Sequence, residues 1–294
     1  MNFIESHYAP GDTAPVKLYY TDQGEGTPIV FIHGWPSDSG MWEYQIAALS
    51  QQGFRCIAYD RRGFGKSDKP VNGHTDYNVL AADLKAVLEG LDLENVTLVG
   101  FSMGAGEVVR YFSRFGGARV AKAIIIGGIT PFMLQTNDNP DGTPKELFDT
   151  FVEQINTDRQ DFLRTFYKQF YGETLINSPV SQAVLDWSWH AALLADHNAT
   201  IGNIRAFSET DFRREMESVN VPCLIIHGDN DKVVPIKPAG QNAARLVPQA
   251  EYLVYEGAPH GLFITHKEKL NADLLGWITE GTLFSNREAD DIII

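Results

Sequence analysis

The stretch VTLVGFSMG, residues 96–104, decides the fold. Its apolar first part predicts a buried strand over Val96–Phe101, and the residues after Ser102 predict a helix over Met103–Phe115. A serine between two glycines at such a junction sits on a sharp turn that pushes its hydroxyl out of the sheet. The helix behind it supplies free backbone N–H groups and the positive end of a dipole. We therefore interpret Ser102 as a nucleophile, with a plain helix-capping serine as the alternative.

Short apolar strands alternate with amphipathic helices on both sides of this junction. Further strands are expected over Ile29–His33, Arg55–Tyr59, Val120–Gly127, Cys223–His227 and Glu251–Tyr255, and further helices over Met41–Gln52, Tyr77–Leu91, Pro238–Leu246 and Leu262–Thr279. The alternation predicts a parallel sheet covered on both faces, with ligands bound beyond the carboxyl ends of its strands. Before it, Phe3–Tyr8 and Val16–Thr21 are expected to pair as antiparallel strands, joined by a turn at Pro10–Asp12.

The alternation is interrupted between Pro131 and about Val219, where the residues are helical, polar and aromatic. We expect a core of residues 1–130 and 220–280, a helical cap of residues 131–219 over one end of the sheet, and a tail of residues 281–294. The tail has no core pattern of its own, although its three final isoleucines leave open that it docks on a neighbouring subunit of a homo-oligomer.

Composition narrows the class of protein. Lys and Arg total 24 against 38 Asp and Glu, a net charge of −14, which argues against nucleic acid or an anionic membrane as partner. Cys56 and Cys223 lie in apolar runs and are expected to be free thiols in the core. The sequence has neither a signal peptide pattern nor an apolar run long enough to span a bilayer, so we expect a reduced, cytoplasmic protein.

A serine hydroxyl needs a neighbouring base, and His260 is the strongest candidate among eight histidines. It lies in EGAPHG, residues 256–261, a rigid loop after the last expected strand. His33 and His227 each precede a glycine at a strand end, where an imidazole commonly braces a loop. The others fall in an edge strand, a loop, the cap or a helix: His7, His74, His190, His197 and His266.

The base in turn needs a carboxylate that fixes its tautomer. The loop GDNDK, residues 228–232, offers Asp231 as first choice and Asp229 as the alternative. Two close aspartates also raise the idea of a metal, but no further oxygen ligands with EF-hand spacing follow, so no metal is expected. The chain order Ser102, Asp231, His260 is that of hydrolases built on a strand–turn–helix nucleophile.

Two N–H donors must face the negative oxygen of a tetrahedral intermediate. We expect the backbone N–H groups of Met103 and Trp35, since Pro36 has none to give. Pro36 also restricts Trp35, and we expect the Trp35 carbonyl to face the cavity. The substrate pocket is expected to be walled by Pro36, Phe132, Phe162 and Trp187, although packing inside the cap is the other interpretation of these aromatic residues.

Together these residues resemble the cofactor-free haloperoxidases, also called perhydrolases, and the bacterial aryl esterases and lactamases close to them. The resemblance extends from about Tyr19 to Trp277 and rests on HGWP (33–36), YDRRGFGKSD (59–68), GFSMGAGEVVR (100–110), DNPDG (138–142) and APHG (258–261). It implies an α/β-hydrolase fold with Ser102, Asp231 and His260 as triad and Trp35 and Met103 as oxyanion donors. It further implies a cofactor-free enzyme that hydrolyses small esters and makes peracids from hydrogen peroxide and short acids. Trp35 stands where many perhydrolases carry phenylalanine and the esterases more often tryptophan, which leaves open whether ester hydrolysis or perhydrolysis is the main activity.

Three alternatives remain beside a small-molecule esterase. A lactonase or amidase would use the same residues on another acyl substrate. Hydrolases that attack through aspartate share the fold but need an acid where this chain has Ser102. A ligand receptor would keep the triad without repeated turnover.

Overall fold

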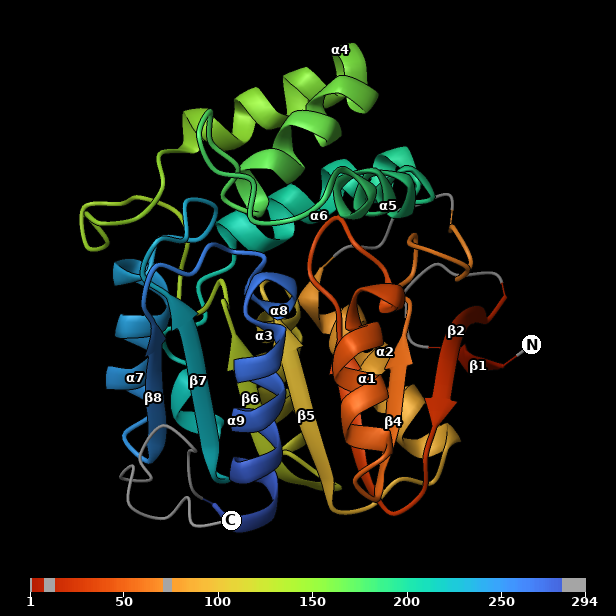
Figure 1. Ribbon diagram of the computed structural model, residues 1–294. Coiled ribbons are helices and arrows are strands. Elements are labelled where there is room, and N and C mark those ends of the chain that lie inside the picture. The colour runs from red at the N-terminus through yellow and green to blue at the C-terminus, as the bar shows by residue number, and fades with distance from the viewer. Residues whose placement is uncertain (1, 8–13, 71–75, 282–294) are drawn as a thin grey trace.

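The computed structural model describes residues 2–7, 14–70 and 76–281. Within them the strands form one eight-stranded sheet in the order β1-β2-β4-β3-β5-β6-β7-β8 (Figure 1). The strands are β1 (Phe3–Ser6), β2 (Val16–Gln23), β3 (Thr27–Ile32), β4 (Phe54–Tyr59), β5 (Val96–Phe101), β6 (Val120–Ile126), β7 (Cys223–Gly228) and β8 (Ala250–Tyr255). Pairing is parallel from β4 through β8 and antiparallel where β2 joins β1 and β4.

Helices cover both faces of the sheet, with α1 and α9 on one face and α2 and α3 on the other (Figure 1). These helices are α1 (Glu43–Ser50), α2 (Tyr77–Gly90), α3 (Gly104–Phe115) and α9 (Lys267–Glu280). The short helices η1 (Ser39–Trp42), η2 (Met216–Ser218), η3 (Lys237–Gln241), α7 (Asn242–Leu246) and α8 (Leu262–Thr265) connect or flank them. Three more, α4 (Lys145–Phe170), α5 (Gln182–Leu193) and α6 (His197–Glu209), lie beyond the carboxyl ends of the parallel strands and are called the cap below (Figure 1).

The α/β-hydrolase fold expected from the sequence is confirmed, together with a helical cap between β6 and β7. The strand Val96–Phe101 has the predicted bounds, and the others differ by one to three residues where the structure describes both ends. The single helix predicted over Leu262–Thr279 is instead two, because the chain leaves helical geometry at His266 (φ −128°, ψ 32°). The Pro10–Asp12 turn lies outside the described residues, and the domain boundaries at 130 and 220 stay predictions.

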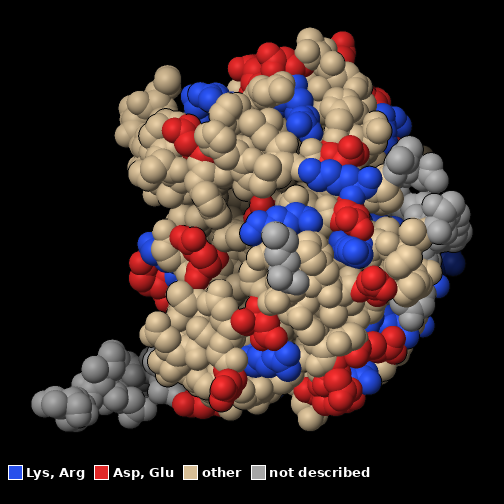
Figure 2. Space-filling view, turned by 90° about the vertical axis from the view of Figure 1, so that its right-hand side faces the viewer, with Lys and Arg blue, Asp and Glu red and all other residues tan. Residues whose placement is uncertain are grey.

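The core is built on the central strands. Every residue of β5 and of β7 is buried, as expected for strands covered on both faces. Cys56 and Cys223 are free and buried, as predicted. Acidic and basic side chains are interspersed on the face drawn in Figure 2. Among the described residues, no helix combines the length and apolar character needed to cross a membrane.

Helix α4 consists of two arms, because Asp158 interrupts it with non-helical angles (φ −153°, ψ 87°). At the end of the first arm the Thr157 hydroxyl donates to the Glu153 carbonyl at 2.9 Å. At the start of the second arm the Asp158 carboxylate accepts the Asp161 N–H at 3.0 Å, as an N-cap does. These two local hydrogen bonds satisfy backbone and side-chain groups at the bend between the arms. We call this bend, with the space between the two arms, the crook of α4.

Two carboxylates meet at the start of η1, directly after the loop that carries Trp35. Asp38 accepts the Gly40 N–H at 2.9 Å, and Asp60 accepts the Ser39 N–H at 2.8 Å. Burial and the neighbouring Asp60 carboxylate raise the pKa of Asp38 from 3.8 to about 6. The folded protein therefore holds the Asp38 proton more tightly than the unfolded chain does.

We expect Asp38→Asn to stabilise the protein at neutral and alkaline pH. A raised folded-state pKa gives stability that is present at low pH and lost as pH rises through about 6. Asparagine keeps the capping oxygen and never ionises, so the gain should be about 1–3 kcal/mol at pH 8 and should shrink towards zero near pH 4. Urea unfolding at both pH values measures it, and a gain of equal size at both would contradict the assignment.

Candidate active site

Ser102 occupies a strained turn between β5 and α3. Its φ is +53°, in the left-handed region that non-glycine residues rarely adopt, and its N–H donates to the Ile126 carbonyl at 2.9 Å. The flanking glycines are required by packing. A Cβ on Gly100 would lie 2.7 Å from the Gly104 carbonyl oxygen, and one on Gly104 would lie 2.6 Å from that of Ile32. The sequence therefore maintains a turn that presents the Ser102 hydroxyl at the sheet edge.

His260 lies beside this hydroxyl. The distance from its Nε2 to the Ser102 Oγ is 2.9 Å, and the imidazole is 1% exposed. Two aromatic rings hold it, that of Phe101 with centroids 4.8 Å apart and that of Phe170 with centroids 4.9 Å apart. Phe170 ends α4, and its carbonyl accepts the Gly261 N–H at 2.8 Å, so the cap positions the histidine loop.

Asp231 meets the other nitrogen of the imidazole, with 2.6 Å between its Oδ2 and the His260 Nδ1. Its Oδ1 accepts the N–H groups of Val233 and Val234 at 2.9 and 2.8 Å. Burial alone would raise the pKa of Asp231, but His260 and His227 hold it well below the usual range. The carboxylate is thus ionised and fully bonded. The alternative, Asp229, lies apart from this contact and accepts the Gly257 N–H at 2.7 Å.

The histidines next to strand-end glycines brace loops. His227 Nε2 lies 2.9 Å from the Val234 carbonyl and 3.5 Å from Asp231 Oδ2, so it also supports the carboxylate. His33 Nε2 accepts the Arg61 N–H at 3.0 Å, and burial together with the Arg61 charge lowers its pKa well below 6.5. Of the remaining histidines, His74 lies outside the described residues.

Trp35 and Met103 are buried residues beside Ser102, and within the described part of the chain neither of their backbone N–H groups donates a hydrogen bond. Trp35 lines the same cavity as Ser102, and Met103 follows it directly. Buried N–H groups nearly always have a partner, so this pair is suited to a ligand oxygen. The Trp35 indole N–H is separately engaged with the cap, where it donates to the Thr200 carbonyl at 3.0 Å.

A network of buried charged and polar side chains connects helix α3 with the loop that carries Trp35. Arg61 Nε donates to Glu107 at 2.6 Å, and an Arg61 NH2 group donates to the His33 carbonyl at 2.7 Å. Tyr59 donates its hydroxyl to Glu107 at 2.6 Å. Burial raises the pKa of Glu107, while Arg61 and the Tyr59 hydroxyl oppose the rise. Because Glu107 belongs to α3 and His33 precedes Gly34-Trp35, the network ties the nucleophile helix to the loop of the Trp35 donor.

The cavity over Ser102 is small and almost wholly apolar. Its volume is about 20 Å³, room for about one water molecule. Besides Trp35 and Ser102, its walls include Ile129, Met133, Phe148, Phe207, Val233 and Val234. Sequence reasoning missed these walls, because the orientation of cap helices over the sheet is a tertiary property that helical periodicity leaves undetermined.

None of the four residues predicted to wall the pocket is among the described residues that line the cavity over Ser102. Phe162 lines a separate hollow in the crook of α4 and contacts Trp35, with ring centroids 6.3 Å apart. Phe132 packs beneath the Arg213 guanidinium, which lies 5.1 Å from the ring centroid. The ring of Trp187 approaches Gly40, and Pro36 is buried without lining the cavity over Ser102.

Comparison with known proteins agrees with the fold described above. The model of the alpha/beta hydrolase fold family matches residues 27–267. A non-heme haloperoxidase from Rhodococcus erythropolis is 43% identical over 263 residues, covering 89% of this chain and 96% of that protein. A bifunctional esterase/perhydrolase from Acinetobacter calcoaceticus is 39% identical, covering 90% and 96%. The crystal structure of a bromoperoxidase from Bacillus anthracis superposes with a TM-score of 0.88 at 40% identity, covering 94% of this chain and 99% of that one.

The matched pair Asp231→Asn and Asp229→Asn tests which carboxylate orients His260. Asparagine at 231 would present an amide that favours the wrong tautomer of the imidazole, so we expect a loss of about 10⁴-fold in kcat for p-nitrophenyl acetate. Asp229→Asn should keep most of the activity, because Asp229 contacts only a loop N–H in the described structure. Circular dichroism confirms that both variants fold, and a larger loss at Asp229 would reverse the assignment.

Proposed function

This chain belongs to the non-heme haloperoxidase and perhydrolase family of α/β hydrolases, and from that premise we propose that it hydrolyses small carboxylic esters through an acyl-enzyme. The observation that carries the proposal is the bonded series from the Ser102 hydroxyl through His260 to Asp231, beside the backbone N–H groups of Trp35 and Met103, which donate no hydrogen bond to any described residue. This is the arrangement that acyl transfer to a serine requires.

In the first step the Ser102 oxygen attacks the ester carbonyl while His260 Nε2 takes the hydroxyl proton. Asp231 accepts the Nδ1–H bond, keeps the imidazole in the right tautomer and stabilises the imidazolium. The carbonyl π electrons move to oxygen, where the Trp35 and Met103 N–H groups would stabilise the charge. One such donor contributes about 3 kcal/mol to the transition state. Collapse expels the alcohol, which receives the proton from His260.

In the second step water attacks the acyl-enzyme, with His260 again as base. His260 then gives this proton to the Ser102 oxygen as the carboxylic acid departs, and the free enzyme is restored. Hydrogen peroxide in place of water gives a peracid by the same electron and proton movements. The peracid then oxidises bromide or chloride in solution. The bifunctional esterase/perhydrolase among the relatives supports this second activity.

The size of the cavity supports short acyl groups. A cavity with room for about one water molecule leaves little space for an acyl chain, and a longer chain must displace part of the apolar wall. Each added methylene displaces more of a close-packed surface. The neutral, apolar lining favours a simple aliphatic acyl group over a charged one.

We expect activity on p-nitrophenyl esters to be highest between acetate and butyrate. Longer chains should lose kcat/KM because they require a larger rearrangement of the cavity wall. A series of acyl lengths at fixed alcohol measures this, with Ser102→Ala as the control that should lose about 10⁴-fold or more in turnover. A maximum at eight or more carbons would contradict the short-acyl proposal. A single stoichiometric burst without turnover would favour a receptor over an enzyme.

Pro36→Leu tests the perhydrolase part. If the Trp35 carbonyl faces the cavity, it accepts a hydrogen bond from attacking hydrogen peroxide, and Pro36 restricts that carbonyl. A difference of only about 1.4 kcal/mol in the transition state shifts partitioning tenfold. We expect Pro36→Leu to lower the ratio of peracid formation to ester hydrolysis severalfold. An unchanged ratio in a folded variant would leave Pro36 as a loop stiffener and nothing more.

A further inference from the structure

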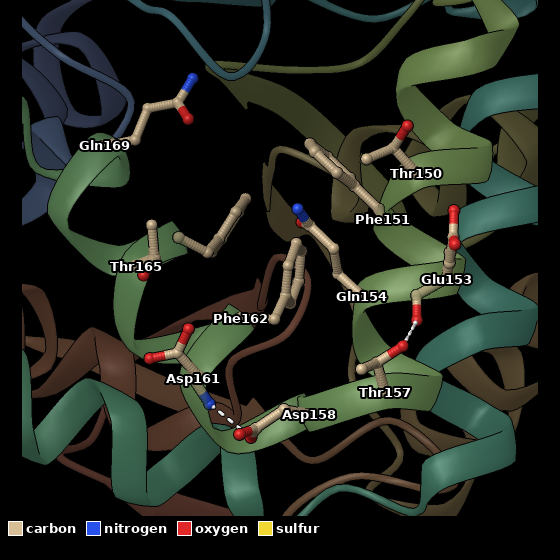
Figure 3. A pocket seen from close by; sticks show the side chains of 11 residues that line it. Thr150, Phe151, Glu153, Gln154, Thr157, Asp158, Asp161, Phe162, Thr165 and Gln169 are labelled. Carbon is tan, nitrogen blue, oxygen red and sulfur yellow. Dashed lines mark hydrogen bonds between the residues drawn. The ribbon is translucent and has the colours of Figure 1, made fainter.

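A hollow near the site lies in the crook of α4 (Figure 3). Its volume is about 510 Å³, within the range of cavities that hold small ligands, and every described residue that lines it comes from α4. The arms before and after Asp158 form its two sides. Figure 3 shows the side chains of Phe151, Gln154 and Phe162 pointing into the space between the arms. The hollow therefore exists because Asp158 bends the helix.

Two phenylalanines separate this hollow from the cavity over Ser102. Phe151 on the first arm and Phe166 on the second line both spaces, and their ring centroids lie 6.4 Å apart. We call this pair the aromatic partition. Phe162 stacks on Phe166 with centroids 6.0 Å apart, and Phe166 in turn meets the Trp35 ring edge-on at 5.2 Å. The hollow is thus one layer of aromatic side chains away from the reacting serine.

The two members of the partition are held differently. Phe166 is 5% exposed and packed between Trp35, Phe162 and Phe170. Phe151 is only half-buried and contacts Phe148, Phe162 and Phe166. A half-buried ring loses fewer contacts when it changes rotamer, so Phe151 is the side of the partition that yields to a ligand.

The lining of the hollow has one sign of charge. Glu153, Asp158 and Asp161 lie on its wall, and among the described residues no lysine, arginine or histidine lines it. Threonine and glutamine side chains supply the remaining polar groups. The wall therefore suits a neutral or cationic group that makes hydrogen bonds, and it repels an anion.

We propose that the crook of α4 is the subsite for the alcohol portion of the ester, reached past Phe151. The inference rests on the proposed ester hydrolysis. The tight cavity over Ser102 holds the short acyl group, and the alcohol extends through the partition into the wider, partly open hollow of about 510 Å³. The substrate class is a short-chain ester of a bulky alcohol that is neutral or positively charged.

The first test changes the size of residue 151 at constant acyl group. Phe151→Ala should raise the ratio of kcat/KM for 2-naphthyl acetate to that for ethyl acetate about tenfold, and Phe151→Trp should lower it. Phe151→Leu repeats the test with a milder change in case the alanine variant is unstable. The matched control is Val152→Ala, a half-buried residue of the same arm that lines neither space, and its ratio should equal that of the wild type.

The second test changes the charge of the crook at constant leaving-group shape. The substrates are the acetate esters of 3-hydroxyphenyltrimethylammonium and 3-hydroxybenzenesulfonate. The wild type should prefer the cation, and Glu153→Gln/Asp161→Asn should reduce the cation-to-anion ratio of kcat/KM about fivefold at low salt, an effect that 1 M NaCl screens. The control is Glu146→Gln, an exposed acid of α4 outside the crook.

The outcomes separate the two proposals. If wild-type protein turns over none of the esters, the proposed function itself fails. If it turns over ethyl acetate but the residue 151 series leaves the alcohol preference unchanged in folded protein, the alcohol subsite is elsewhere. If the series instead shifts the preferred acyl length, the crook receives the acyl chain and the assignment is overturned. A charge preference that persists in the double variant would also overturn it.

Discussion

Arg61 and Glu107 form an ion pair whose side chains are 1% and 0% exposed. Removing two such charges from water costs several kcal/mol for each ion, and the cost is recovered only when every polar atom finds a partner. Here the hydrogen-bond partners of Arg61 belong to different segments of the chain. Arg61 follows β4, Glu107 lies on the helix behind Ser102, and Arg61 also donates to the carbonyl of His33, which follows β3. One pair thus fixes three segments relative to each other at the sheet edge where the reaction takes place. A neutral pair would fill the same volume without the same directional constraint.

The part of the site that could be predicted from the sequence is the part fixed by local backbone geometry. Ser102 needs a turn at positive φ between a buried strand and a helix, and the glycines at 100 and 104 leave a visible signature of that need. His260 and Asp231 follow successive strands, so the parallel topology alone brings them to the same edge. The buried strands are similarly evident, because a sheet covered on both faces requires continuous apolar runs.

The cap was predicted only as helical, and its shape was missed. Apolar residues recur with helical spacing on both sides of Asp158, so periodicity indicates one region of helix and conceals the bend. The available signal was Thr157-Asp158 with Asp161 three residues on, a capping pattern in the middle of a helix. The placement of Phe132 and Trp187 had no such signal. Which face of a cap helix meets the cavity depends on contacts with Trp35, Thr200 and the core, and these are separated by more than a hundred residues in sequence.

The hydrogen bond from the Trp35 indole to the Thr200 carbonyl links the loop of a proposed oxyanion donor to cap helix α6. Phe170 does the same on the other side, since its ring and carbonyl hold the His260 loop. If the cap of this chain were exchanged for another, the Trp35 indole would lose its acceptor, the Thr200 carbonyl. The His260 loop would lose its contacts with the ring and carbonyl of Phe170. A different cap on this core would therefore need matching changes in the two core loops that carry Trp35 and His260.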